Sequence, residues 1–173
     1  YVTMTQQALS IFDVDTENFT IRGSQLFHSP GQVYVEGDWS NGAFWLAAKA
    51  LGSPLTVDNL DSNSAQGDRA AAQLLPQLRR ENYTIDASDI PDLVPIMAVV
   101  AAASQGAEFT NIQRLRLKET DRVATVCAML NALGAATHAT ENTLTVFPST
   151  FEGCVIDAAN DHRIAMSAAI AAT

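Results

Sequence analysis

The sequence is poor in cysteine and in cations. Its 173 residues include two cysteines, Cys127 and Cys154, and neither has a CxxC or Cys/His partner at a spacing suited to a metal. We therefore expect reduced thiols and a cytoplasmic protein. Ten Lys and Arg stand against 19 Asp and Glu, a formal charge of −9. This balance excludes nucleic acid and anionic membranes as partners, because each phosphate contact requires a cation, but it allows a small anionic ligand.

Long apolar runs are also missing. The two longest candidates, Met97–Ala103 and Ala165–Ala172, are alanine-rich and shorter than the roughly 18 residues of a membrane span, so no membrane partner is expected. The first residue is Tyr1 rather than methionine, and the chain stops within an apolar helical pattern at Ala168–Thr173. We therefore expect a fragment of a longer protein.

The cations are unevenly placed along the chain. Four of the ten fall within nine residues, namely Arg114, Arg116, Lys118 and Arg122. If residues 114–117 are extended and Lys118 opens a helix, these cations crowd near one strand-to-helix junction, where a cation opposes the helix macrodipole. His162 and Arg163 repeat this placement at a second helix start. Either an anion neutralises these groups, or Arg122 and Arg163 pair with Asp121, Asp161 or other acids nearby.

Apolar periodicity and capping residues predict alternating helices and strands. Helices are predicted over Tyr1–Phe12, from Ser40 or Asn41 to Leu51, and over Asp68–Arg79, Asp92–Gln105, Thr120–Leu133 and from His162, capped by Asn160 or Asp161. Strands are predicted at Phe19–Arg22, Ser24–Phe27, Val33–Val35, Leu55–Val57, Tyr83–Ile85, Ala107–Ile112, Ala136–Ala139, Thr143–Phe147 and Cys154–Ile156. Asp38 and Asp121 are further candidate helix caps. Gly52, Gly106 and Gly134 are the predicted helix stops.

The element order repeats itself. Asp38 and Asp92 are 54 positions apart, and Asp68-Arg69 recurs 53 positions later as Asp121-Arg122. A third start follows at Asp161. The pattern indicates an α/β fold of repeated β-α-β-α-β-β units, in which the boundary between the first two units is open.

Two motifs resemble the signatures of one enzyme family. Lys118-Glu119-Thr120-Asp121-Arg122 and Asn160-Asp161-His162-Arg163-Ile164-Ala165-Met166 are similar to those of 5-enolpyruvylshikimate-3-phosphate synthases. Val35–Ser40 and Ile90-Pro91-Asp92 resemble two further segments of that family. The resemblance implies an incomplete enolpyruvyl transferase fold, an inside-out α/β barrel. Residues 1–32 would end the first domain, and residues 33–173 would form a truncated C-terminal domain.

The resemblance also implies a reaction. The family transfers the enolpyruvyl group of phosphoenolpyruvate to the 5-hydroxyl of shikimate 3-phosphate and releases phosphate. The implied partners are these small anionic substrates, with no metal or organic cofactor and a monomeric full-length enzyme. Half of the cleft cannot position two substrates, so we expect the fragment alone to be inactive. The alternatives are an enzyme like UDP-N-acetylglucosamine enolpyruvyl transferase and a non-catalytic anion-binding module.

By the same resemblance, three residues carry the proton transfers. Asp92 would bind the shikimate hydroxyls and act as a base, and Lys118 would contact the same substrate and share this proton transfer. Glu119 would carry protons at the enolpyruvyl carbon.

The remaining implied residues bind substrate. Arg122 and Arg163 would clamp phosphoenolpyruvate, because a guanidinium suits bidentate contact with a carboxylate or phosphate. Tyr1 would line the shikimate pocket. His162 would either orient its neighbour Arg163 or transfer a proton.

Overall fold

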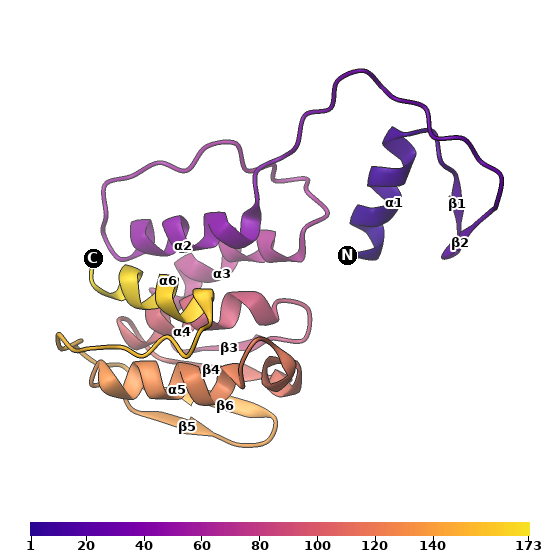
Figure 1. Cartoon of the computed structure of the whole chain (residues 1–173). Helices are drawn as coiled ribbons and strands as arrows, with labels where there is room; N and C mark the ends of the chain where they lie inside the picture. The colour runs from indigo at the N-terminus through magenta and orange to yellow at the C-terminus, as the bar shows by residue number, and fades with distance from the viewer. The chain divides into compact units, whose positions relative to one another are not determined.

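The structure, a computed structural model, describes residues 1–173 (Figure 1). The chain divides into two compact units. The first comprises Tyr1–Gly37 and Asn59–Gln66, and the second comprises Asp38–Asp58 and Gly67–Thr173.

The first unit begins with the predicted helix, α1 (Val2–Ile11), followed by a hairpin of β1 (Thr16–Glu17) and β2 (Thr20–Ile21). Asn18 and Phe19 both have positive φ, 46° and 67°, which is the geometry of a two-residue hairpin turn. The strand predicted at 19–22 is confirmed as β2, although the turn takes its first residue and its partner is β1. The strand predicted at 24–27 is wrong, since these residues form no strand.

Two stretches of the first unit that are distant in sequence are held together by hydrogen bonds. The Gly37 amide donates to the Asn59 carbonyl at 3.1 Å, and the Ser64 hydroxyl donates to the Glu36 carboxylate at 3.0 Å. A Cβ on Gly37 would lie 2.1 Å from the Asn59 carbonyl oxygen. Only glycine permits this close approach.

The second unit is mixed α/β. Its helical elements are α2 (Trp39–Ala50), η1 (Gly67–Ala70), α3 (Ala71–Leu78), η2 (Pro91–Leu93), α4 (Val94–Ala102), η3 (Ile112–Leu117), α5 (Arg122–Ala132) and α6 (His162–Ala171). Its strands are β3 (Tyr83–Asp86), β4 (Ala107–Thr110), β5 (Thr137–Ala139) and β6 (Thr143–Val146). They form an open sheet in the order β3-β4-β6-β5, in which β3 and β4 are parallel and the other pairs antiparallel. No closed barrel is formed.

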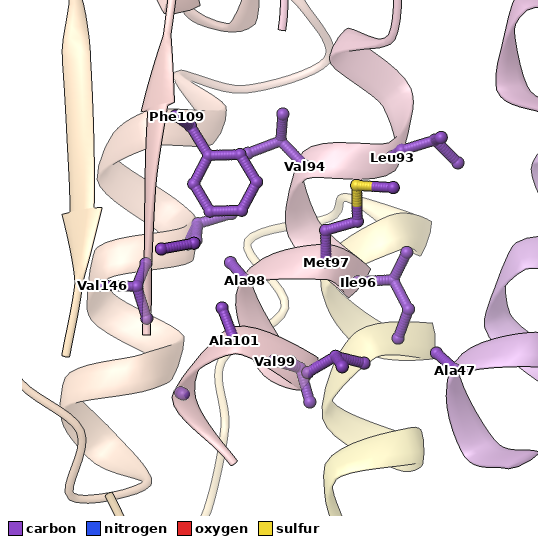
Figure 2. Close-up of a cluster of buried hydrophobic side chains, with 14 of the residues drawn as sticks. Ala47, Leu93, Val94, Ile96, Met97, Ala98, Val99, Ala101, Phe109 and Val146 are labelled. Atoms are coloured by element: carbon purple, nitrogen blue, oxygen red, sulfur yellow. The ribbon is translucent and has the colours of Figure 1, made fainter. Parts of the chain in front are cut away.

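Helix α4 forms the centre of the second unit. All nine of its residues are buried, since α2 and α6 pack against it on one side and the sheet on the other. Figure 2 shows Phe109 of β4 and Val146 of β6 on the side of Ala98, and Ile96 directed toward Ala47 of α2. A helix enclosed in this way is apolar all round, which explains its uninterrupted hydrophobic sequence.

The helix ends follow the capping predictions in most cases. Asp161 caps α6 and Asp121 caps α5, each accepting backbone N–H groups of the first turn. The cap of α2 is Asp38 rather than Ser40 or Asn41, whose N–H groups it accepts. Gly134 directly follows the C-cap of α5 with φ 91°, the conformation that favours glycine there.

Three further predicted strands are wrong: residues 33–35, 55–57 and 154–156 form no strand. The first two belong to the first repeat, which lacks a hairpin. In the second repeat β4 pairs with β6 of the β5–β6 hairpin that follows α5, whereas only residues 79–82 separate α3 from β3. An extended segment without a partner strand leaves its backbone groups unpaired.

The sequence of α3 is adapted to the missing hairpin. At the 53-residue offset, Val126 and Leu130 of α5 correspond to Gln73 and Gln77 of α3. Both α5 residues are fully buried, whereas Gln73 is exposed and Gln77 is half-buried. Polar side chains thus stand where the second repeat buries apolar ones against its sheet.

Two further findings concern the basic segment and the helix lengths. Residues 114–117 are not extended but belong to η3, and the helix predicted from Thr120 begins at Arg122. No helix combines the length and the hydrophobicity that a membrane crossing requires.

Candidate active site

A charged cluster forms where three segments of the second unit meet. Asp92 comes from η2, Arg122 from the first turn of α5, and Arg163 from the first turn of α6. Lys118 and Glu119 lie in the loop between η3 and α5. The repeated helix starts bring together residues that are up to 71 positions apart in the sequence.

Arg122 is the centre of this cluster. Its side chain is fully buried, and all three guanidinium nitrogens contact carboxylates. Nε donates to Asp161 Oδ2 at 2.7 Å, Nη1 donates to Asp92 Oδ1 at 2.6 Å, and Nη2 donates to Glu119. Burial alone would lower the pKa of Arg122, but the hydrogen bond and charge of Asp161, with Glu119 and Asp92, raise it. The guanidinium is therefore charged, and each of its nitrogens has a carboxylate partner.

Asp161 holds Arg122 from the protein interior. Its carboxylate is fully buried, accepts the Arg163 backbone N–H at 2.9 Å, and lies 3.3 Å from the Thr120 hydroxyl. Burial would raise the pKa of Asp161, but the hydrogen bonds from Arg122 and the Arg163 backbone lower it below its usual range. A second Asp161 oxygen lies 3.4 Å from Arg122 Nη2. The same carboxylate thus caps α6 and anchors the guanidinium.

Asp92 is shared by three cations. Besides Arg122, Lys118 Nζ lies 2.9 Å and Arg163 Nε 3.9 Å from its Oδ1. Arg163 Nη1 also donates to the Asp92 backbone carbonyl at 3.4 Å. Burial would raise the pKa of Asp92, but the Lys118 hydrogen bond and the nearby Arg163 and Arg122 lower it overall. Asp92 is therefore ionised at neutral pH.

Glu119 forms the open edge of the cluster. Its side chain is 49% exposed, and Arg122 is its one ion-pair partner. The three cations Lys118, Arg122 and Arg163 and the three carboxylates of Asp92, Glu119 and Asp161 balance one another in formal charge. These six side chains are therefore neutral in total formal charge before an external anion binds.

Asp68 adds a fourth carboxylate near the cluster, from η1. Burial raises its pKa, and the charges of Asp92 and Asp38 add to the rise, whereas Ser40 and Arg163 oppose it. Sequence reasoning missed this residue. The 53-residue repeat that relates Asp68-Arg69 to Asp121-Arg122 is the signal that could have found it.

The structure brings five of the seven predicted site residues together, namely Asp92, Lys118, Glu119, Arg122 and Arg163. His162 is adjacent, with a 60% exposed side chain whose Nδ1 lies 4.0 Å from Asp161 Oδ1. Tyr1 belongs to the first unit, where it is exposed and lines an apolar hollow with Leu9 and Phe19.

The acids do pair with the arginines, but the partners differ from the neighbours considered in the sequence. Asp121 pairs with Arg116 at 3.0 Å, while Arg122 pairs with Asp161 of the other motif. The sequence suggested Asp161 mainly as a helix cap. It did not indicate that Asp161 contacts Arg122 and the Thr120 hydroxyl, because neither contact is local along the chain.

Comparison with known proteins shows the family of the chain. Residues 1–81 and 79–173 match the family model described as EPSP synthase (3-phosphoshikimate 1-carboxyvinyltransferase). The chain belongs to the EPSP synthase family. A 3-phosphoshikimate 1-carboxyvinyltransferase of Clostridium novyi is 38% identical over 99% of this chain and 44% of its own length. The proteins of the same name from Clostridium acetobutylicum and Clostridium perfringens (strain SM101) are 38% and 36% identical.

The chain spans less than half the length of these EPSP synthases, 44% to 46%. Their matched regions extend over 194 to 197 residues, against 173 in this chain. The two matched segments of the family model meet at residues 79–81, directly after α3. This is the place where the first repeat lacks its hairpin.

Proposed function

We propose that this chain supplies one side of the active site of an enzyme that transfers the enolpyruvyl group of phosphoenolpyruvate to the 5-hydroxyl of shikimate 3-phosphate. The observation that carries the proposal is the buried Arg122, paired with Asp161, Asp92 and Glu119 beside Lys118 and Arg163. Residues 1–32 would end one domain and residues 33–173 would form most of the other, in the repeated-unit arrangement of enolpyruvyl transferases.

The reaction needs a base, a proton carrier and cations, and the cluster contains all three. The acceptor hydroxyl loses a proton as its oxygen bonds to carbon 2 of phosphoenolpyruvate, while carbon 3 gains a proton. Phosphate and one proton then leave. Asp92 is proposed as the base, Glu119 as the proton carrier, and Arg122 and Arg163 as the phosphoenolpyruvate clamp.

The charges around Asp92 set a condition on its role. With Lys118, Arg122 and Arg163 around it, the lowered pKa makes Asp92 a weak base in the free protein. Anionic substrates that neutralise these cations would raise its proton affinity. Asp92 would therefore become a competent base only when the substrates are bound.

The proposal is tested with the full-length protein that contains this chain. Phosphate release from phosphoenolpyruvate should occur with shikimate 3-phosphate and not with UDP-N-acetylglucosamine as acceptor. Arg163→Ala should raise the KM for phosphoenolpyruvate about ten- to a hundredfold, because a charge-assisted hydrogen bond contributes about 1.5–3 kcal/mol. Arg114→Ala is the matched control, since Arg114 donates only to the Ser88 carbonyl.

Two outcomes would contradict the proposal. Transfer to UDP-N-acetylglucosamine alone would assign the other enolpyruvyl transfer, and an unchanged KM in Arg163→Ala would remove the clamp. The 173-residue chain by itself should release no phosphate. If the 173-residue chain released phosphate steadily, and if Glu119→Ala abolished that release, this half of the enzyme would be sufficient for catalysis.

A further inference from the structure

The Arg122 guanidinium presents no accessible nitrogen to an incoming anion. Nε contacts Asp161, Nη1 contacts Asp92 and Nη2 contacts Glu119. The side chain is also fully buried. A substrate anion can therefore reach Arg122 only if one of these carboxylates leaves it.

The three carboxylates are held to very different degrees. Asp161 is fully buried and is also bound by the Arg163 backbone N–H and the Thr120 hydroxyl. Asp92 is 13% exposed and is bound by Lys118 as well. Glu119 is 49% exposed and has no hydrogen bond or ion pair other than the one to Arg122. Glu119 is the carboxylate that can leave with the fewest broken contacts.

We propose that Glu119 occupies the place of a substrate anion on Arg122 in the free protein, and that the incoming carboxylate or phosphate group displaces it. Asp161, with Thr120, keeps Nε fixed during this exchange, so the guanidinium plane stays in place. No bond between heavy atoms forms or breaks in the exchange, and one anion replaces another on Nη2.

The exchange would couple binding to proton transfer. While Glu119 is paired with Arg122, its carboxylate is engaged in that ion pair. Once displaced, its side chain is free to turn toward the bound substrate. This consequence rests on the proposed function, in which Glu119 carries protons at the enolpyruvyl carbon, whereas the exchange itself concerns only anion binding.

The exchange predicts that Glu119 competes with anions, so its removal should tighten their binding. A half-exposed ion pair of this kind is worth at most about a fivefold change in affinity. We therefore expect Glu119→Gln to bind inorganic phosphate about two- to fivefold more tightly than the unchanged protein. A merely structural role for Glu119 would predict equal or weaker binding.

The experiment is isothermal titration of the full-length protein with inorganic phosphate, which requires neither an acceptor nor turnover, and then with phosphoenolpyruvate. Asp89→Asn is the matched control, because it removes one negative charge from an exposed residue three positions before Asp92. Its affinity should stay within the error of the unchanged protein. Circular dichroism establishes that both variants keep their helix content.

The outcomes separate this inference from the proposed function. Unchanged or weaker phosphate binding by Glu119→Gln, or an equal gain in Asp89→Asn, overturns the exchange. Tighter phosphate binding by Glu119→Gln, in a protein that transfers no enolpyruvyl group to shikimate 3-phosphate, supports the exchange and overturns the proposed function. Absence of phosphate and phosphoenolpyruvate binding in all three proteins overturns both.

Discussion

Replacing Asp161 by asparagine tests whether the Arg122 ion pair supports the fold. Asp161 and Arg122 are both fully buried and 2.7 Å apart. Removing one partner of a buried pair costs about 3–5 kcal/mol, because the other charge is left without compensation. Arg122 keeps Asp92 and Glu119, so we expect the lower end of this range, about 3 kcal/mol.

The choice of asparagine separates the ion pair from the helix cap. The asparagine side chain would still accept the Arg163 backbone N–H that Asp161 accepts, because asparagine caps helices as well as aspartate does. Asp161→Ala removes both functions and should cost about 1 kcal/mol more. Asp121→Asn is the matched control. It keeps the cap of α5 and loses a partly exposed pair with Arg116, which is worth at most about 1 kcal/mol.

The assay is urea unfolding followed by the helical circular dichroism signal, first at pH 7 and then across a pH series. The folded-state pKa of Asp161 is lowered, so its contribution is complete above the unfolded-state pKa of about 3.9. The contribution is lost as the pH falls through the lower folded-state pKa. The difference between the unchanged protein and Asp161→Asn should therefore persist down to about pH 4.

Two results would refute this reasoning. The first is a loss of less than about 1 kcal/mol for Asp161→Asn at pH 7, with the helix content unchanged. The second is a difference that disappears near neutral pH, which would mean that some group other than the Asp161 carboxylate is being titrated.

Three other substitutions test the core, a backbone approach and the fourth carboxylate. Phe109→Ala removes a fully buried ring and should lower the free energy of unfolding by about 3–5 kcal/mol. The control Phe147→Ala, 47% exposed, should change it far less. Gly106→Ala should lower the free energy of unfolding, measured in urea, more than Gly52→Ala does. Both glycines have positive φ, but of the two only Gly106 would place a Cβ against backbone, at 2.7 Å from the Val146 oxygen. The folded-state pKa of Asp68 is raised, so the unchanged protein loses stability as the pH rises through that pKa and the carboxyl ionises. Asp68→Asn lacks this ionisation and should therefore become more stable relative to the unchanged protein over the same pH range. Equal costs for the glycine variants, or a pH-independent Asp68→Asn difference, would contradict these expectations.

The sequence predicted features that depend on local contacts. The apolar run that became α4 and the caps Asp121 and Asp161 were predicted correctly, because helix ends are determined by neighbouring residues. The motif from Lys118 to Arg122 also predicted a concentration of charge at a helix start, and the structure places it there.

The sequence could not predict features that depend on distant partners. Residues 55–57 have strand-like composition but form no strand, because a strand exists only with a neighbour and the first repeat has no hairpin to provide one. In the same way, Arg122 pairs with Asp161 across 39 positions, although Asp121 is adjacent in sequence. The second outcome depends on the packing of α5 against α6.

The acidic character of the chain and its cationic site are compatible because the carboxylates of the site have two different tasks. Asp161 uses one oxygen to accept the Arg163 backbone N–H at the α6 N-terminus, so a carboxylate already lies at this helix end. Affinity for an anion must then come from side-chain cations, and in the free protein these would repel one another if unpaired. Glu119 and Asp92 remove that repulsion. If Glu119 exchanges with substrate, one residue both stabilises the free site and yields its position to the ligand, and a net charge of −9 is no obstacle to binding.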